Sequence, residues 1–307
     1  MIKLGLYMLN YERPGEKLSF ERFASLVQKA ESLGFDSVWI TDHIVLGSKR
    51  VFPYLESLTT LAALSAKTSK IKLGVCTLVL PLREPVLLAR TVSTLNMISN
   101  GRITLCVAGG WYKREFKACG ADYTRRGHIT EERLVLLRKL LSEDDINLNV
   151  GTTQLEHVTI LPHAKIPVLM GGYGPKTLSR VGRFSDGWIP TSYPPDAFNE
   201  AWKTIVSHAG QAGRDINTLD NGDLIIGCVD RTSAEARVRK FASVYLDEIP
   251  WSKADHVKSA VAGSPDACVE KIKEYEKAGA KNLIITPCDF EEEQIDLIAK
   301  EILPHFR

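Results

Sequence analysis

The sequence KIPVLMGGYGPKTLSRVGRFSDGWIP, residues Lys165–Pro190, decides the fold. It begins with an apolar run of strand length, Ile166–Met170, which stops at a turn rich in glycine. Pro175 then opens a segment whose apolar residues recur at helical spacing. Asp186–Pro190 has the pattern of a further strand. The stretch therefore predicts a strand, a glycine turn, a helix and the start of the next strand.

The turn consists of Gly171, Gly172, Tyr173 and Gly174. Glycine lets the main chain turn tightly and approach a ligand closely. A helix that begins at such a turn points free N–H groups and the positive end of its dipole toward it. The turn is therefore either a phosphate-binding site or no more than a tight connection between a strand and a helix, and these residues alone leave both open.

The same strand-helix unit recurs along the whole chain. Eight strand-like segments, each followed by a helical pattern, run from Ile2–Leu9 to Asn282–Thr286. We therefore predict a (β/α)₈ TIM barrel that occupies residues 1–307 as a single domain. The competing fold is a doubly wound sheet, but it would carry a G-x-G-x-x-G pattern early in the chain, and none follows the first strand.

Two segments interrupt the alternation. The segment from about residue 145 to 160 has the pattern of a β-hairpin before strand five. The segment from about residue 248 to 263 is predicted to be a helical insertion after strand seven. A loop, Trp111–His128, separates strand four from a helix predicted over Glu131–Leu141. This loop and the insertion are the candidate covers of a site at the strand ends.

Composition excludes several classes of protein. The 307 residues are 44% hydrophobic and 25% charged, with a net charge of +2, so nothing favours a nucleic acid or membrane partner. The six cysteines include no C-x-x-C pair, which is typical of reduced, buried thiols. No apolar segment is long enough to span a membrane, and the N-terminus lacks a signal-peptide pattern. We expect a cytoplasmic protein.

Asp42 and His43 follow the second predicted strand. In a barrel, the C-terminal strand ends form the face that carries the chemistry. An imidazole can exchange a proton near neutral pH, and an adjacent carboxylate can orient it. The alternative is that Asp42 caps the following segment and His43 is a packed or solvated loop residue.

Other strand ends on this face suit a planar, phosphorylated ligand. Gly109 and Gly110 form a second glycine pair, after strand four, and Trp39, Trp111 and Trp188 provide flat apolar walls near the same end. No set of His and Asp residues converges from the strand ends, so we predict no metal site. No G-x-S-x-G pattern supports covalent acyl chemistry.

Several phrases, in this order, resemble the bacterial-luciferase-like superfamily of flavin- and deazaflavin-dependent oxidoreductases. The resemblance covers about the first 190 residues. The phrases are Gly34–Trp39 with Asp42 and His43; Leu61–Thr68; Ile71–Gly74; Pro85–Arg90; Ser99–Arg102; Gly110 and Trp111 with Glu115, Phe116 and Gly120; Arg126 and Gly127 with Glu132; Gly171 and Gly172; and Asp186–Trp188.

The resemblance implies a barrel that binds coenzyme F420 or FMN at the strand ends. It implies that His43 is the proton acceptor or donor beside the reactive ring carbon, and we expect Asp42 to orient it. It further implies that a bulged third strand, with a non-prolyl cis peptide at Cys76–Thr77, backs the ring. A homodimer is typical of the superfamily.

The resemblance also implies a place for the cofactor phosphate. The residues expected there are Gly171, Gly172, Tyr173 and Gly174, with help from Ala108, Gly109 and Gly110. One departure concerns the substrate. The sugar-phosphate dehydrogenases of the F420 branch carry an acid just after the glycines of strand four, where this chain has Trp111.

Three hypotheses follow. The first is an F420-dependent oxidoreductase that transfers a hydride between the deazaflavin and a small organic substrate. The second is an FMN-dependent luciferase-like monooxygenase that uses reduced flavin and O₂. The third is a flavin-binding protein without catalytic activity, since a fold alone does not fix a function.

Overall fold

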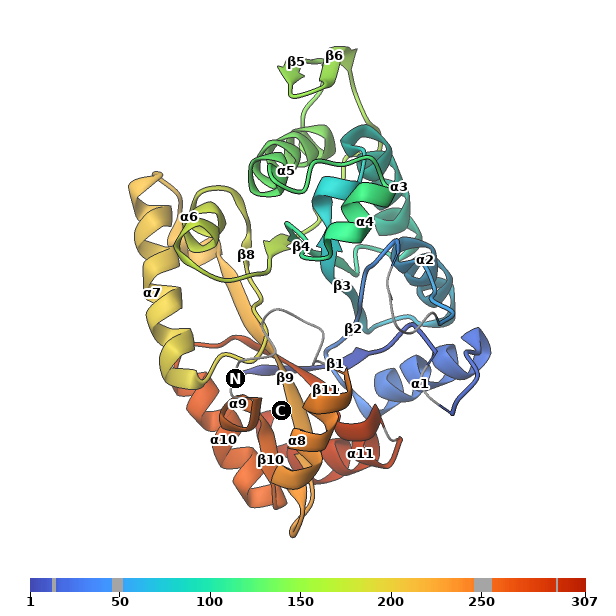
Figure 1. The fold of residues 1–307 in the computed structure, drawn as a ribbon, viewed down its shortest axis with the longest axis vertical. Helices are drawn as coiled ribbons and strands as arrows, with labels where there is room; N and C mark the ends of the chain where they lie inside the picture. The colour runs from blue at the N-terminus through green and yellow to red at the C-terminus, as the bar shows by residue number, and fades with distance from the viewer. Residues whose placement is uncertain (13–14, 46–51, 246–255, 291) are drawn as a thin grey trace.

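The computed structural model describes residues 1–12, 15–45, 52–245, 256–290 and 292–307. Its centre is a closed ring of eight parallel strands, which confirms the predicted TIM barrel (Figure 1). Neighbouring strands pair in chain order, and the pairing of β8 with β9 completes the ring. The barrel strands are β1 (Lys3–Met8), β2 (Ser37–Ile40), β3 (Lys72–Val79), β4 (Ile103–Ala108), β7 (Val168–Met170), β8 (Gly187–Trp188), β9 (Asp220–Val229) and β11 (Asn282–Pro287).

Helices surround the barrel, as Figure 1 shows. The helices are α1 (Phe20–Leu33), α2 (Ser57–Lys67), α3 (Pro85–Ile98), α4 (Lys113–Ala118), α5 (Arg126–Ser142), α6 (Pro175–Phe184), α7 (Pro195–Gln211), α8 (Ala234–Tyr245), α9 (His256–Ser259), α10 (Pro265–Lys277) and α11 (Glu292–Leu297). Single turns are η1 (Leu80–Leu82), η2 (Ile216–Thr218), η3 (Cys288–Phe290), η4 (Ile298–Ile302) and η5 (Leu303–Phe306).

Helix α1 shows how the sequence sets these boundaries. The side chain of Ser19 accepts a hydrogen bond from the backbone N–H of Arg22 at the N-terminus, and Gly34 adopts φ 87° at the C-terminus. Between these caps, the buried side chains of Phe23 and Val27 lie one turn apart on the face that packs against the strands.

Side chains from alternate positions on each strand fill the inside of the barrel. One of them, Trp39 of β2, occupies space left by Gly74 of β3. A Cβ atom at Gly74 would lie 2.2 Å from the Trp39 ring, so only glycine fits there. The members of this inner cluster are Trp39, Cys76, Cys106, Leu169, Ile189, Leu224 and Ile284, with Tyr7 packed against them.

The hairpin before strand five is confirmed. Strand β5 (Ile146–Val150) pairs with β6 (Thr153–Val158) in antiparallel orientation, and the hairpin projects from the barrel at the top of Figure 1. The segment predicted as a helical insertion lies outside the described residues up to residue 255. Its remainder contains α9 and a short strand, β10 (Val261–Gly263), which pairs with β9. The end of this segment therefore extends the sheet.

The segment after strand four differs from the prediction. It was expected to be a loop up to His128, but it contains α4, and α5 begins at Arg126, ahead of the predicted Glu131. The N-cap residue of α5, Arg125, forms no side-chain capping hydrogen bond. The sequence therefore holds no capping signal that marks this helix start.

Two further observations concern the chain as a whole. No helix in the described ranges is long and apolar enough to cross a membrane. All six cysteines are free, and five of them are buried, which agrees with the predicted buried thiols. The exception is Cys119, which is exposed after the end of α4.

Candidate active site

His43, beyond the end of β2, is held by a glutamate from another part of the chain. Its ring nitrogen Nδ1 lies 3.2 Å from Oε2 of Glu115, a residue of α4. The other oxygen of Glu115, Oε1, accepts backbone N–H groups from Ile44 at 2.5 Å and from Val45 at 3.2 Å. The Glu115 side chain is fully buried, whereas that of His43 keeps 11% of its surface exposed. One buried carboxylate therefore fixes both the imidazole and the chain that follows it.

A glycine turn lets α4 bring Glu115 to this place. Gly110, after β4, adopts φ 73°, and a Cβ atom there would lie 2.6 Å from Val79 and 2.9 Å from Phe116. Any larger residue would push α4 away from β3. Within α4 only Glu115 and Phe116 are buried, so the helix turns these two side chains inward.

Asp42 does not hold His43, which corrects the prediction that it orients the imidazole. Its Oδ1 accepts hydrogen bonds from the hydroxyl of Ser57 at 2.7 Å and from Nη2 of Arg83 at 2.5 Å. Its Oδ2 accepts the backbone N–H of Val79 at 3.0 Å. Asp42 and His43 are adjacent in the sequence, yet their side chains bind different partners. Asp42 instead joins the ends of β2 and β3 to the start of α2.

Aromatic rings surround the imidazole of His43. The ring of Trp111 meets it edge-on with centroids 5.9 Å apart, and the ring of Tyr54 does so at 6.5 Å. Tyr11 stacks on Tyr54 at 5.7 Å. Burial raises the pKa of the Tyr54 phenol, and that of Tyr7 inside the barrel, well above the ordinary value. Both phenols therefore stay neutral and keep their protons at neutral pH.

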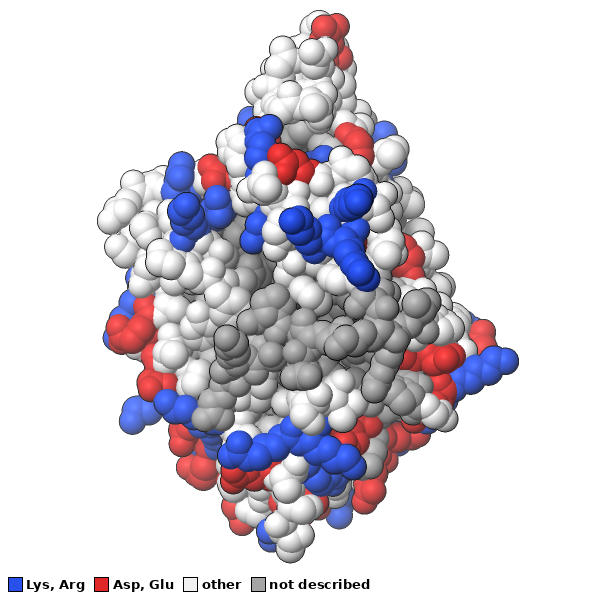
Figure 2. Space-filling view, viewed as in Figure 1, with Lys and Arg blue, Asp and Glu red and all other residues white. Residues whose placement is uncertain are grey.

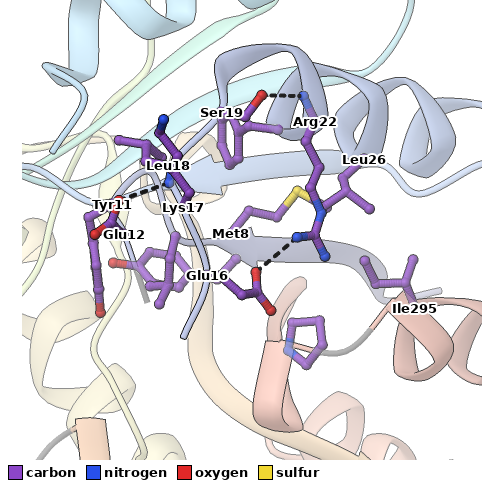
Figure 3. Close-up of a pocket in the computed structure, with 14 residues that line it drawn as sticks. Met8, Tyr11, Glu12, Glu16, Lys17, Leu18, Ser19, Arg22, Leu26 and Ile295 are labelled. Carbon is purple, nitrogen blue, oxygen red and sulfur yellow. Dashed lines mark hydrogen bonds and ion pairs between the residues drawn. The ribbon is translucent and has the colours of Figure 1, made fainter. Parts of the chain in front are cut away.

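A small cavity adjoins this aromatic wall. It has a volume of about 80 Å³ and lies between the end of β1, the start of α1 and Ile295 of α11 (Figure 3). Tyr7 and Tyr11 line it together with Met8, and the ion pair between Glu16 and Arg22 closes another side. It is too small for a flavin, so it adds at most a side pocket to the site.

The bulged part of β3 has the expected backbone. The peptide bond Cys76–Thr77 is cis, and the pairing of β3 with β4 shifts register between Cys76 and Leu78. Thr77 packs directly against the glycine turn after β7, because a Cβ atom at Gly171 would lie 2.5 Å from its Cγ2. The strand expected to back the cofactor ring and the turn expected to hold its phosphate are therefore neighbours.

Two partly buried hydrogen bonds shape the turn at residues 171–174. Nε1 of Trp188 donates to the carbonyl oxygen of Gly172 at 3.1 Å, and the hydroxyl of Tyr173 donates to the carbonyl oxygen of Thr191 at 2.6 Å. A trans peptide holds its C=O and N–H on opposite sides. The bond from Trp188 therefore turns the N–H of Tyr173 away from the barrel wall, the orientation that suits an anion. Gly172 and Gly174 adopt φ 111° and 82°, conformations that favour glycine.

The second glycine turn, Ala108–Gly110, faces the start of α5. A Cβ atom at Gly109 would lie 3.3 Å from the hydroxyl of Thr130 and 3.9 Å from Cγ of Arg126. The guanidinium of Arg126 lies 4.1 Å above the ring of Tyr123. Within the described ranges, no group of three or more His, Cys, Asp or Glu side chains is arranged to hold a metal ion.

Glu115 was not predicted to be a functional residue, because it contacts His43 from 72 positions further along the chain. The remaining predicted residues lie around one region. Glu115 links His43 to the helix that follows Gly110, Val79 links Gly110 to Asp42, and Thr77 contacts Gly171. These contacts define a class of protein, a TIM barrel with a titratable side chain and two glycine turns at the C-terminal ends of its strands.

The comparison with protein families gives a more particular result. The model of the luciferase-like monooxygenase family matches residues 4–248, and the chain belongs to this family. The chain is 29% identical to the 5,10-methylenetetrahydromethanopterin reductase of Methanolobus tindarius, over 81% of this chain and 70% of that protein. It is 24% identical to the F420-dependent glucose-6-phosphate dehydrogenase of Amycolatopsis mediterranei (strain U-32), over 100% and 99% of the two chains.

Solved structures share the fold. The F420-dependent secondary alcohol dehydrogenase in complex with an F420-acetone adduct superposes with a TM-score of 0.83 at 19% identity, over 100% of this chain and 99% of the other. The monooxygenase RslO1 from Streptomyces bottropensis also gives 0.83, at 20% identity and with full coverage of both chains. The family match and the two sequence relatives, the reductase and the glucose-6-phosphate dehydrogenase, identify the chain as an enzyme of the flavin- or F420-dependent oxidoreductase type.

Proposed function

We propose that this protein is an F420-dependent oxidoreductase that transfers a hydride between the deazaflavin and a small organic substrate. The observation that carries the proposal is the pair His43–Glu115, with its 3.2 Å contact, in the same region as the two glycine turns. The F420-dependent glucose-6-phosphate dehydrogenase and the F420-dependent secondary alcohol dehydrogenase among the similar proteins support the choice of cofactor.

The residues present fit such a cofactor. In the turn at residues 171–174, Gly174 adopts φ 82° and no described atom lies within 4 Å of its Cβ position, so the backbone there is open to close approach by a ligand. The phosphate would lie against residues 171–174 with help from residues 108–110. The ring would lie against Cys76 and Thr77. When bound, F420 supplies the group that accepts or delivers the hydride.

The side chains of the site would handle the proton. A carboxylate only accepts hydrogen bonds, so Glu115 keeps a proton on Nδ1 of His43. Nε2, on the other side of the ring, is then the nitrogen that takes or gives the proton during turnover. Trp111 and Tyr54, on the edges of the imidazole, keep bulk water from it.

The aromatic wall favours an apolar or weakly polar substrate. Trp111 stands where the sugar-phosphate dehydrogenases of the F420 branch carry an acid, so we do not extend a sugar-phosphate activity to this chain. The wall formed by Tyr11, Tyr54 and Trp111 instead suits a small alcohol, carbonyl compound or other organic molecule whose reacting carbon can pack against the deazaflavin.

A second candidate function is that of an FMN-dependent monooxygenase. It is favoured by the family itself, which is described as luciferase-like monooxygenase, and by the fold shared with RslO1. Oxygen consumption coupled to reduced FMN separates the two functions, because a deazaflavin reacts poorly with oxygen.

The test begins with fluorescence titrations of the purified protein with F420 and with FMN. We expect F420 to bind more tightly, and we expect hydride transfer to a panel of small alcohols and aldehydes to depend on His43. His43→Asn should lower turnover at least about 100-fold with little change in F420 affinity, since the replaced group acts on the proton. Unchanged turnover in this variant would contradict the assigned role. Binding of FMN alone, with oxygen uptake, would favour the second function.

We also propose that two copies of the chain associate through α3. The side chains of Leu87 and Ile98 are three turns apart on one face of this helix, and these residues are 69% and 47% exposed. Neighbouring Met97 is 60% exposed. A Leu87→Lys, Ile98→Lys variant should sediment as a monomer. A wild-type protein that sediments as a monomer at micromolar concentration would refute this pairing.

A further inference from the structure

Two cysteines meet where β9 and β11 end. The last residues in register on these parallel strands are Gly227 and Pro287, so Cys228 and Cys288, the next residue of each segment, lie side by side. Both side chains are fully buried in one hydrophobic cluster. Neighbouring strands are about 4.8 Å apart. A disulfide needs a Cα separation of roughly 4.4–6.8 Å, so these two thiols satisfy the main geometric condition for forming one.

Helix α8 packs over this pair, because its buried side chains belong to the same cluster. Arg237 of α8 forms ion pairs with Asp230 at 3.3 Å and with Asp289 at 3.0 Å. These two acids come shortly after Cys228 and Cys288 in the sequence. The side chain of Arg237 is 24% exposed, and Figure 2 shows charged side chains over α8 in the lower half of the view. A charged, partly solvated layer therefore lies next to the two thiols.

The two thiols differ in acidity. A hydrogen bond from the thiol of Cys288, together with the positive charge of Arg237, holds the pKa of Cys228 below its usual range, although burial opposes this. The same hydrogen bond raises the pKa of Cys288, so the last proton of the pair stays on that sulfur. The thiolate is the nucleophilic form of cysteine. Cys228 is therefore the sulfur that reacts first with an oxidant, and Cys288 is placed to react with the product.

Another two cysteines, which we call the inner pair, provide a comparison within the same chain. Cys76 of β3 and Cys106 of β4 are partners in register, and both are buried in the inner cluster of the barrel. Burial raises the pKa of Cys106 well above its usual value, and no cation among the described residues offsets this effect. Both pairs are adjacent on parallel strands, so the cation beside Cys228 is what distinguishes them chemically.

We propose that Cys228 and Cys288 form a redox modification site, where a hydroperoxide such as hydrogen peroxide oxidises the two thiols to a disulfide. The Cys228 sulfur attacks one peroxide oxygen and the O–O bond breaks. The departing hydroxide takes the Cys228 proton to become water, and a sulfenic acid remains on Cys228. The Cys288 sulfur then attacks the Cys228 sulfur, so an S–S bond forms and the S–O bond breaks. This second hydroxide takes the Cys288 proton and leaves as water. The two thiols lose two electrons, and the peroxide gains them.

The disulfide would join η3 to the end of β9 directly beneath α8. It would fix the backbone that carries Asp230 and Asp289, the two acids that hold Arg237. Oxidation would therefore attach α8 more firmly to the barrel. The proposed hydride transfer uses neither sulfur, so this inference does not depend on the proposed function.

The experiment treats the whole protein with hydrogen peroxide, in a Cys119→Ser background that removes the exposed thiol. At several times the remaining thiols are alkylated under denaturing conditions, and unreduced peptides are identified by mass spectrometry. Cys288→Ser is treated with peroxide and dimedone, which labels sulfenic acids. Arg237→Gln removes the cation beside Cys228, and Arg239→Gln makes the same change at an exposed position of the same helix. Thermal unfolding checks that each variant is folded.

We expect a disulfide between Cys228 and Cys288 to form at least about tenfold faster than one in the inner pair, and to be reversed by dithiothreitol. Dimedone should label Cys228 in Cys288→Ser. Arg237→Gln should slow the oxidation at least about fivefold, and Arg239→Gln should change it by less than about twofold. Amide exchange in residues 234–245 should slow in the oxidised protein.

Three results would overturn the proposed site: both thiols remain open to alkylation throughout, the inner pair is oxidised equally fast, or the two arginine variants react at the same rate. Unchanged amide exchange in a fully oxidised protein would overturn the effect on α8. None of these results bears on F420 binding or hydride transfer, so the proposed function is tested separately.

Discussion

Replacing Glu115 by glutamine tests how the active-site imidazole is held. Glutamine has the same shape, and its oxygen can still accept the N–H groups of Ile44 and Val45. Its NH₂ group must then face Nδ1 of His43, where it can only donate. The neutral imidazole therefore has to place its proton on Nε2. We expect this change of tautomer to remove the acceptor that the proton transfer needs.

The size of the effect follows from the contact that is lost. A hydrogen bond to a charged group contributes roughly 1.5–3 kcal/mol. If this bond stabilises the protonated imidazole in the transition state, turnover falls by about 10- to 150-fold. Stability should change by less than about 1 kcal/mol, because both backbone N–H groups keep an acceptor. Glu115→Ala is the matched control. It leaves both groups buried without an acceptor, so it should lower the free energy of unfolding by about 3–5 kcal/mol.

The tautomer can be measured without knowing the substrate. Long-range ¹H–¹⁵N correlation spectra of protein labelled at histidine distinguish a proton on Nδ1 from one on Nε2. His43→Asn identifies the signal among the seven histidines. We expect the neutral ring to carry its proton on Nδ1 in the wild type and on Nε2 in Glu115→Gln. The same tautomer in both proteins would refute the reasoning.

Three further outcomes test other parts of the structure. Asp42→Asn should lower the free energy of unfolding by about 1–3 kcal/mol, measured by denaturant titration, because it weakens a partly buried hydrogen bond to the charged side chain of Arg83, and it should leave the His43 tautomer unchanged. Trp188→Phe, which removes the donor to Gly172, should weaken FMN binding by about threefold or more but leave riboflavin, which has no phosphate, nearly unaffected. Burial raises the pKa of Asp223, so the folded protein holds a proton that the unfolded chain releases above about pH 4, and stability falls as pH rises. The melting temperature of Asp223→Asn relative to wild type should therefore increase between pH 4 and pH 8, and a constant difference would contradict this.

The barrel could be predicted because each of its signals is local. The glycine turn after Ile166–Met170 and the helix after Pro175 lie within one continuous stretch, and the strand after it follows at once. Eight such units leave few alternative folds. The start of α5 could not be predicted in the same way, since Arg125 gives no capping signal and Gly127 lies within the first turn.

The partner of His43 could not be predicted because it depends on tertiary contacts. Asp42 is adjacent in sequence, yet its carboxylate accepts hydrogen bonds from Ser57 and Arg83 instead. Glu115 reaches the imidazole only because Gly110 lets α4 fold back over the end of β3. No spacing in the sequence encodes that approach, and only the phrase shared with the superfamily drew attention to Glu115.

The shortest strand of the barrel is β8, which carries Trp188. This strand has two residues, and it is in register with β7 through the single pair Met170–Trp188. The shortest strand pairing of the ring, between β7 and β8, thus adjoins the turn where a ligand would bind. In the empty protein, amide protons of β7 and β8 should exchange with solvent sooner than those of β1 or β11. A cofactor that contacts both Thr77 and the turn at residues 171–174 would stabilise the pairing of β7 with β8. Its binding would therefore slow amide exchange far more in these two strands than elsewhere in the ring.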